Sequence, residues 1–286
     1  MKKVVISVDS TCDLSPEVKE AYGLQNYPFH IVFRGEDYID NETITPADIF
    51  AGYREDGSMP KTAAINELEY LKHFRKFVSE DCEVVHISLA APLSSAYENA
   101  CSAAKIVGHT YVVDSQNLSC GMGYLAIEGA KLAMKGYSAR KIAKHLCAMR
   151  ERIHVSFVMD TFDFLAAGGR CPAALAHVGK MMKIKPEILV DPKTGNMSIG
   201  RLYRGKMQRV LPRYVQDNLA RYADQKVDCE DMFISSADMD PDLVEMVRRE
   251  IGKHLPIRRF HISEVSCCVA SHCGPGTLGF LVVTER

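Results

Sequence analysis

The chain has 286 residues, of which 47% are hydrophobic and 25% charged, and its formal net charge is −1. This composition is typical of a globular protein large enough for two domains. The balanced charge argues against a polyelectrolyte binder of nucleic acid, and no apolar run reaches the length of a membrane span. We therefore expect neither a nucleic-acid partner nor stable membrane insertion.

The ten cysteines form no C-x-x-C pair, and the ten histidines form no H-E-x-x-H pattern. Several of these cysteines lie in apolar segments, where a free thiol behaves as a small hydrophobic side chain. We expect free thiols in a reducing cytoplasm, and neither a metal site nor a cofactor.

The N-terminal segment opens like a parallel α/β sheet. The apolar run Val4–Val8 predicts a buried strand, and Ser15 with Pro16 predicts the start of a helix after a polar loop. Further strands are expected at 84–89, 110–114 and 153–159, and helices at 96–107, 121–135 and 138–150. This alternation predicts a Rossmann-like domain over residues 1–160.

Two insertions interrupt the alternation. Residues 28–40 alternate apolar and polar side chains around a turn at Arg34-Gly35-Glu36-Asp37, which predicts a hairpin. Helices are predicted from Thr45 to about Asp56 and from Asn66 to Val78, and residues 57–64 between them are predicted to be irregular.

The pattern changes after Gly169. Residues 185–190 and 196–202 predict two strands of a hairpin, because Asp191-Pro192-Lys193-Thr194-Gly195 between them is a turn sequence. Strands at 232–235, 257–265 and 280–283 and helices at 206–223 and 241–254 are predicted to follow. A smaller α+β domain with an antiparallel sheet is therefore expected over residues 161–286.

Two glycine-containing corners are candidates for a site. One is Ser271–Gly279, a predicted tight turn with His272 at its entrance, and the other is Thr161–Arg170. We expect the fold to bring them together. The alternative for the first corner is a hairpin turn with an incidental histidine.

Three loops carry polar side chains near predicted strand ends. Asp9, Ser10 and Thr11 follow the first strand, where ligands of parallel sheets bind. Thr62 and Ser94 are hydroxyl residues in predicted loops. Each of these side chains has an alternative role as a helix cap or loop hydrogen-bonder.

One region of the predicted second domain is basic. Its residues are Lys180, Lys183, Lys185, Arg201, Arg204, Lys206, Arg209 and Arg213. A solvated face is one explanation, and a docking surface for an acidic partner or for phosphates is the other.

The chain resembles the DegV family of two-domain fatty-acid-binding proteins along essentially its whole length. The resemblance rests on the order and spacing of several short motifs: Asp9-Ser10-Thr11 with Asp13-Leu14, Pro60-Lys61-Thr62, Leu93-Ser94, Val113-Asp114-Ser115 with Gly121-Met122-Gly123, Gly168-Gly169-Arg170, Lys185-Pro186 and His272-Cys273-Gly274-Pro275-Gly276. It implies a Rossmann-like domain, a smaller α+β domain, and one fatty acid in a tunnel between them.

The resemblance also implies a carrier without catalytic activity of its own, which presents the acyl carboxylate to a separate fatty acid kinase. The ligand-binding residues would be Thr62, Ser94, His272, Gly274, Gly276, Arg170 and Ser10. Arg201, Arg204 and Lys206 would help to dock the kinase.

The chain departs from the family at one point near the expected carboxylate site. Ala63-Ala64-Ile65 follows Thr62, where the family often has Ser-Gln-Pro. The alternative function is a Rossmann-like enzyme in which Asp9, Ser10 and His272 act on a small carboxylated or phosphorylated substrate.

Overall fold

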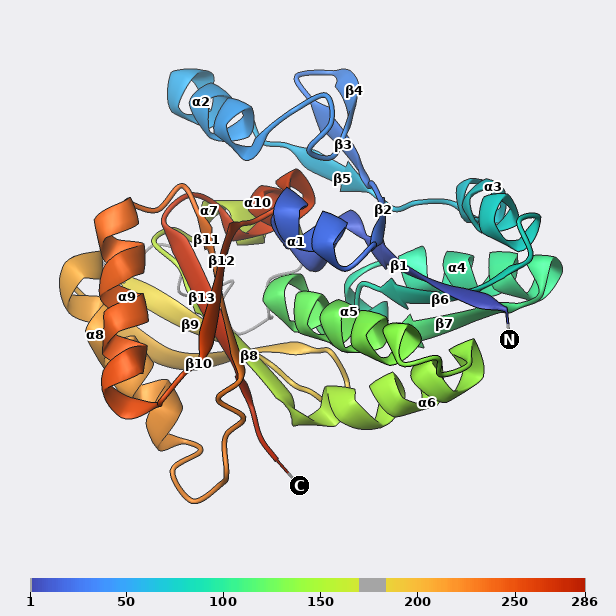
Figure 1. Cartoon of the computed structure of the whole chain (residues 1–286). Helices are drawn as coiled ribbons and strands as arrows, with labels where there is room; N and C mark the ends of the chain where they lie inside the picture. The colour runs from blue at the N-terminus through green and yellow to red at the C-terminus, as the bar shows by residue number, and fades with distance from the viewer. Residues whose placement is uncertain (1, 170–183, 286) are drawn as a thin grey trace.

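The structure is a computed structural model of the chain and describes residues 2–169 and 184–285. Figure 1 shows an α/β half, an antiparallel half and a small projecting arm. The strands are β1 (Lys3–Asp9), β2 (Gln25–Tyr27), β3 (His30–Phe33), β4 (Glu36–Ile39), β5 (Lys61–Ala63), β6 (Cys82–Ser88), β7 (Thr110–Asp114), β8 (Ile153–Val158), β9 (Ile184–Val190), β10 (Met197–Arg204), β11 (Asp231–Ala237), β12 (Arg259–Glu264) and β13 (Thr277–Val283). The α-helices are α1 (Pro16–Ala21), α2 (Pro46–Asp56), α3 (Glu67–Val78), α4 (Ala96–Val107), α5 (Ser119–Met134), α6 (Ala139–Met149), α7 (Asp163–Ala167), α8 (Met207–Ala220), α9 (Pro241–His254) and α10 (Cys267–Cys273). Short 3-10 turns are η1 (Ser10–Cys12), η2 (Ala91–Leu93) and η3 (Arg150–Arg152).

A parallel sheet with strand order β2-β1-β6-β7 forms the centre of the first half. The last five residues of β1 are buried, as expected for an apolar strand covered on both faces. Helices α5 and α6 cover one face of this sheet, and α3 and α4 cover the other (Figure 1). The predicted Rossmann-like parallel sheet is confirmed.

Capping side chains start two helices where the sequence predicts them. The hydroxyl of Thr45 accepts a hydrogen bond from the Asp48 amide at 3.3 Å, and the Asp48 carboxylate accepts one from the Thr45 amide at 2.9 Å. Asn66 and Glu69 make the same reciprocal pair at the start of α3. Each pair satisfies two amides that the helix itself leaves without partners.

The arm consists of α2 and a three-stranded sheet with order β4-β3-β5 (Figure 1). The predicted hairpin of β3 and β4 is confirmed. Strand β5 was wrongly predicted as irregular, and its middle residue Thr62 pairs with Ile31. A strand of three residues that pairs with a distant segment leaves almost no local pattern in the sequence.

The second sheet has strand order β10-β9-β8-β13-β11-β12 and is antiparallel except between β11 and β12. The predicted hairpin of β9 and β10 is confirmed. Strand β8, which we predicted to end the first sheet, instead pairs with β13 and β9 in the second. A strand buried on both faces fits the centre of either sheet, so periodicity alone did not assign it. The division into domains at residue 160 stays a prediction.

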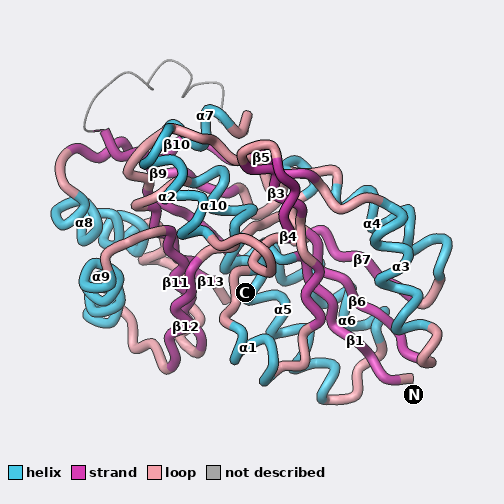
Figure 2. The backbone as a smooth tube through the Cα atoms, turned by 90° about the horizontal axis from the view of Figure 1, so that it is seen from above, coloured by secondary structure: helices cyan, strands magenta, loops and turns pink. Residues whose placement is uncertain are grey.

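Helices cover the second sheet on its outer side and separate it from the first sheet on its inner side. Helices α8 and α9 pack on each other at the outer side of the second sheet, while α5 contacts β8, β11 and β13 from the first half. Figure 2 shows α10 next to α2, and α10 contacts α2, β3 and β5 of the arm as well as α7 of the second half. One hydrophobic core contains both Val84 of β6 and Phe157 of β8, so apolar packing is continuous between the halves.

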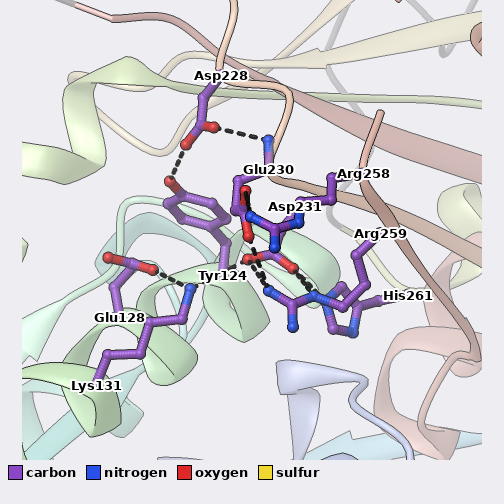
Figure 3. A network of polar contacts seen from close by, with 9 residues as sticks. All are labelled: Tyr124, Glu128, Lys131, Asp228, Glu230, Asp231, Arg258, Arg259 and His261. Atoms are coloured by element: carbon purple, nitrogen blue, oxygen red, sulfur yellow. Dashed lines mark hydrogen bonds and ion pairs between the residues drawn. The ribbon is translucent and has the colours of Figure 1, made fainter. Parts of the chain in front are cut away.

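A network of charged groups also joins the halves, as Figure 3 shows. Tyr124 of α5 donates a hydrogen bond to Asp228 at 3.0 Å, and Lys131 of α5 lies 3.1 Å from the carboxylate of Asp231 at the start of β11. Asp231 also accepts from Arg259 at 2.6 Å and contacts His261 at 2.8 Å. Burial alone would raise the Asp231 pKa, but these hydrogen bonds and charges hold it below its usual range.

Candidate functional site

A cavity of about 240 Å³ lies where the arm, the first sheet and the second half meet. Its volume approaches the lower end of the range typical of small-molecule sites, roughly 300–1,000 Å³. Most of its wall is apolar, and the polar side chains in it are few. The apolar and thiol residues that line it are Phe29, Ala64, Leu89, Leu93, Leu118, Phe157, Leu165, Met197, Cys268, Val269 and Cys273.

Thr62 and His272 meet in this wall. The Thr62 hydroxyl and the Nε2 atom of His272 share a hydrogen bond of 2.9 Å. Thr62 is the middle residue of β5, and His272 is in the last turn of α10. The prediction that both lie in loops is therefore wrong, because α10 occupies the segment before the glycines. The prediction that they lie together is supported by this contact.

Ser94 lines the same cavity from the segment between η2 and α4. Its hydroxyl oxygen accepts a hydrogen bond from the Ala96 amide at 3.2 Å, so the capping role left open by the sequence is present. A hydroxyl that accepts one hydrogen bond still has its own proton to donate. Ser94 can therefore cap α4 and donate to a ligand at the same time.

The two glycine-containing corners pack against each other, as expected. Helix α7 contacts α10, and Gly168 at its end lies against the His272 ring, where an added Cβ would overlap the Nδ1 atom. Gly274 and Gly276 have φ angles of 71° and 72°, a region that favours glycine. A Cβ at Gly274 would lie 2.8 Å from Phe164, and one at Gly276 would lie 2.7 Å from Asp160.

Gly274 and Gly276 are not among the residues that line the described cavity. Their geometry explains them as close-packing positions that let the chain leave α10 and enter β13. Their assignment as ligand-binding residues stays a prediction, with packing as the role that the contacts support.

Ser10 is also absent from the cavity wall. It is 2% exposed, donates to Asp40 at 2.6 Å and accepts from the Phe29 amide at 3.1 Å. Both hydrogen bonds are internal, as in the loop role that the sequence left open. Its neighbour Thr11 lines the cavity instead.

The groups of the enzyme alternative are not brought together. Asp9 is fully buried and accepts hydrogen bonds from Tyr70 at 2.6 Å, Ser88 at 2.9 Å and the Leu89 amide at 2.9 Å. It is not a cavity-lining residue, whereas His272 is. Within residues 2–169 and 184–285, no cluster of three or more metal-ligating side chains is present.

The basic residues lie at a different place from the cavity. Arg204 and Lys206 line an open hollow at the start of α8, together with Lys185, Arg209 and Arg213. Arg201 is exposed and forms an ion pair of 3.0 Å with Asp217. Arg170, Lys180 and Lys183 lie outside the described residues.

Sequence reasoning missed the apolar wall of the cavity. Leu118, Phe157 and Met197 come from three distant segments, and none carries a motif. Their local signal is weak: Phe157 and Met197 lie near the ends of β8 and β10, and Leu118 directly precedes α5. Which of many apolar side chains face one cavity depends on how the two sheets pack, and that is a tertiary property.

Comparison with known proteins identifies the family. A family model described as "Uncharacterised protein, DegV family" matches residues 3–285. The chain belongs to the DegV family. A DegV domain-containing protein of Staphylococcus aureus (strain COL) is 26% identical over 290 residues, with the whole of both chains covered.

Solved structures of DegV proteins share the fold. A DegV family protein from Thermus thermophilus, described by its fatty acid binding, has a TM-score of 0.89 and 26% identity, with 99% of this chain and 100% of that one covered. A DegV lipid-binding protein from Thermotoga maritima has a TM-score of 0.85 and 26% identity, with 100% and 99% covered. Within the described residues, no helix combines the length and apolar character needed to cross a membrane.

Proposed function

We propose that the chain binds one long-chain fatty acid in this cavity, with its carboxylate at Thr62, Ser94 and His272. The observation that carries the proposal is the 2.9 Å hydrogen bond between Thr62 and His272 in a mainly apolar cavity that Ser94 also lines. The polar residues of the wall are Thr11, Thr62, Ser94, Ser95 and His272, and a mainly apolar wall with a few polar residues suits a ligand with one polar end. The fatty acid binding described for the Thermus thermophilus relative supports the same ligand class.

The energetics of such a ligand suit the site. Burial contributes roughly 0.8 kcal/mol per methylene, so about fifteen methylenes give roughly 12 kcal/mol before the costs of association and ordering. A buried carboxylate must be hydrogen-bonded or paired. Two hydroxyls and an imidazole provide donors, and Asp9 is held in a separate buried network.

We further propose that the chain is a carrier without catalytic activity of its own, which presents the carboxylate to a separate fatty acid kinase in the cytoplasm. Arg201, Arg204 and Lys206, with Arg170 outside the described residues, are the proposed docking residues. The exposure of Arg201, Arg204 and Lys206 and the basic hollow at the start of α8 suit an acidic partner surface. The nine cysteines of the described part form no disulfide with one another, which fits a reducing compartment.

Native mass spectrometry of the protein purified from cells tests the proposed ligand. We expect a species heavier than the polypeptide by the mass of one fatty acid, which is lost on collisional activation. A ligand-free protein that also fails to take up added palmitate or oleate would contradict the proposal.

A further inference from the structure

Helix α10 forms one wall of the cavity, and two buried carboxylates hold its first residues. Asp13 accepts a hydrogen bond from the Ser266 amide at 2.8 Å, and Asp40 accepts one from the Cys267 amide at 2.7 Å. Both carboxylates belong to the first half of the chain, whereas α10 belongs to the second. They therefore fasten the element that carries His272.

Asp13 is an unusual anchor. It is 3% exposed, and its second carboxylate oxygen, Oδ2, is buried with no hydrogen-bond partner among the described residues. The pKa of Asp13 is raised to about 7, because burial outweighs the hydrogen bond from the Ser266 amide, which lowers it, and the charge of Asp40 adds to the rise. A buried oxygen without a partner is a natural place for a proton.

The other titratable groups around Asp13 and Asp40 do not change their charge in the pH range where Asp13 titrates. Burial raises the pKa of Asp40 as well, while Lys19 of α1 lowers it. The neighbouring thiols of Cys12, Cys120 and Cys273 have pKa values raised by burial to about 11, 12 and 12, so they stay neutral. Asp9 on β1 is ionised within its own hydrogen-bonded network.

We propose that Asp13 is a positioning residue whose proton controls how firmly α10 closes the cavity. When α10 separates from η1, Asp13 meets water and its pKa returns to the ordinary carboxyl range. The docked state therefore keeps a proton that the undocked state releases. By linkage, docking is strongest at acidic pH, weakens as pH rises toward about 7, and levels off above it.

Weaker docking of α10 at higher pH should change how fast a ligand leaves the cavity. This expectation rests on the proposed function. If a fatty acid occupies the cavity, α10 forms part of the wall that holds it. We expect the fatty acid to leave faster at pH 8 than at pH 6, because this wall separates more often at the higher pH.

Hydrogen exchange of the ligand-free protein tests the proposal without any fatty acid. Protection factors of the amides at 266–273 are measured at pH 6 and pH 8, after correction for the intrinsic exchange rate. A carboxyl with a pKa of about 7 predicts a fall of about tenfold in wild type between these values. Asp13→Asn cannot release a proton in either state, so its protection should not change between pH 6 and pH 8 and should be at least as high as that of wild type at pH 6.

Asp238→Asn is the matched control, because Asp238 also joins the halves, through Arg54 of α2 at 2.7 Å, but is exposed and bonds to α2 and not to the start of α10. It should follow wild type. Equal protection of wild type at both pH values, or an Asp13→Asn variant that loses protection like wild type, would overturn the proposal. The hydrogen-exchange result does not depend on a ligand. If the protein fails to bind fatty acid, that failure counts against the proposed function and not against the role of Asp13.

Asp40→Asn gives a second test should Asp13→Asn fail to fold. This variant removes the other carboxylate that holds α10. If Asp13 is the group that titrates, the fall in protection between pH 6 and pH 8 should remain in Asp40→Asn. Loss of the fall would assign the pH dependence to Asp40 and contradict the role of Asp13.

Discussion

Thr62 and His272 are 210 residues apart in the sequence, and their side chains share a hydrogen bond of 2.9 Å. One residue belongs to the arm of the first half and the other to α10 of the second. A ligand carboxylate that binds beside this pair would contact both halves at once. The hydroxyl groups near this contact are therefore the first place to test the proposed function.

Ser94→Ala and Thr62→Val should each weaken fatty acid binding by about tenfold to a hundredfold. A hydrogen bond to a charged group contributes roughly 1.5–3 kcal/mol, which corresponds to this range. The double variant should lose less than the sum, because both hydroxyls serve one carboxylate. Titration calorimetry with palmitate measures the change, and melting without ligand is the control. Variants that simply unfold would identify these hydroxyls as structural caps.

Gly168→Ala should weaken binding through His272. The φ angle of Gly168 suits any residue, but the added methyl would overlap the imidazole, so the ring has to move. We expect a loss of affinity of roughly tenfold, the cost of one displaced hydrogen bond. Gly252→Ala is the matched control, because its Cβ would enter open space on α9. Equal affinity of both variants would show that the position of the ring does not matter for binding.

The sequence predicted more of the fold than of the site. Capping pairs such as Asn66 with Glu69, and the turn at Asp191–Gly195, act within a few residues and can be read locally. Strand β5 and helix α10 were missed because each is short and stabilised from elsewhere. Thr62 pairs with Ile31, and the α10 amides bond to Asp13 and Asp40.

The order of the motifs singles out three polar residues that line one cavity, and their role in ligand binding stays a prediction. Thr62, Ser94 and His272 were singled out from the residues and the resemblance, and all three line one cavity. Ser10 was chosen for its place after β1, but its side chain bonds internally and Thr11 faces the cavity. A one-residue difference of this kind depends on the turn of η1, which the sequence alone did not specify.

Arg204→Glu should slow acyl-phosphate formation in an assay that couples the chain to a fatty acid kinase, while fatty acid affinity stays the same. Surface charges act mainly on association rate, so the effect should shrink as salt is raised. Lys72→Glu makes the same charge change on the exposed side of α3 and should leave the rate unaltered. A matching loss of fatty acid binding in Arg204→Glu would remove the docking role.

Asp231→Asn should lower the free energy of unfolding near pH 7 by about 2 kcal/mol, because it leaves Arg259 and Lys131 without their buried partner. The Asp231 pKa is below its usual range in the folded state, so its contribution is present above about pH 4 and is lost at lower pH. Urea unfolding of both proteins at pH 7 and pH 3 measures this. A stability difference that persists unchanged at pH 3 would disprove the ionic contribution.

The central claim is that the cavity binds a fatty acid by its carboxylate, and the most direct test compares palmitic acid with its methyl ester. Affinities for both ligands are measured on wild type, Ser94→Ala and Thr62→Val. We predict that wild type binds the acid more tightly than the ester, and that the two substitutions weaken the acid while hardly changing the ester. Equal binding of acid and ester by wild type would contradict a carboxylate site at Thr62, Ser94 and His272.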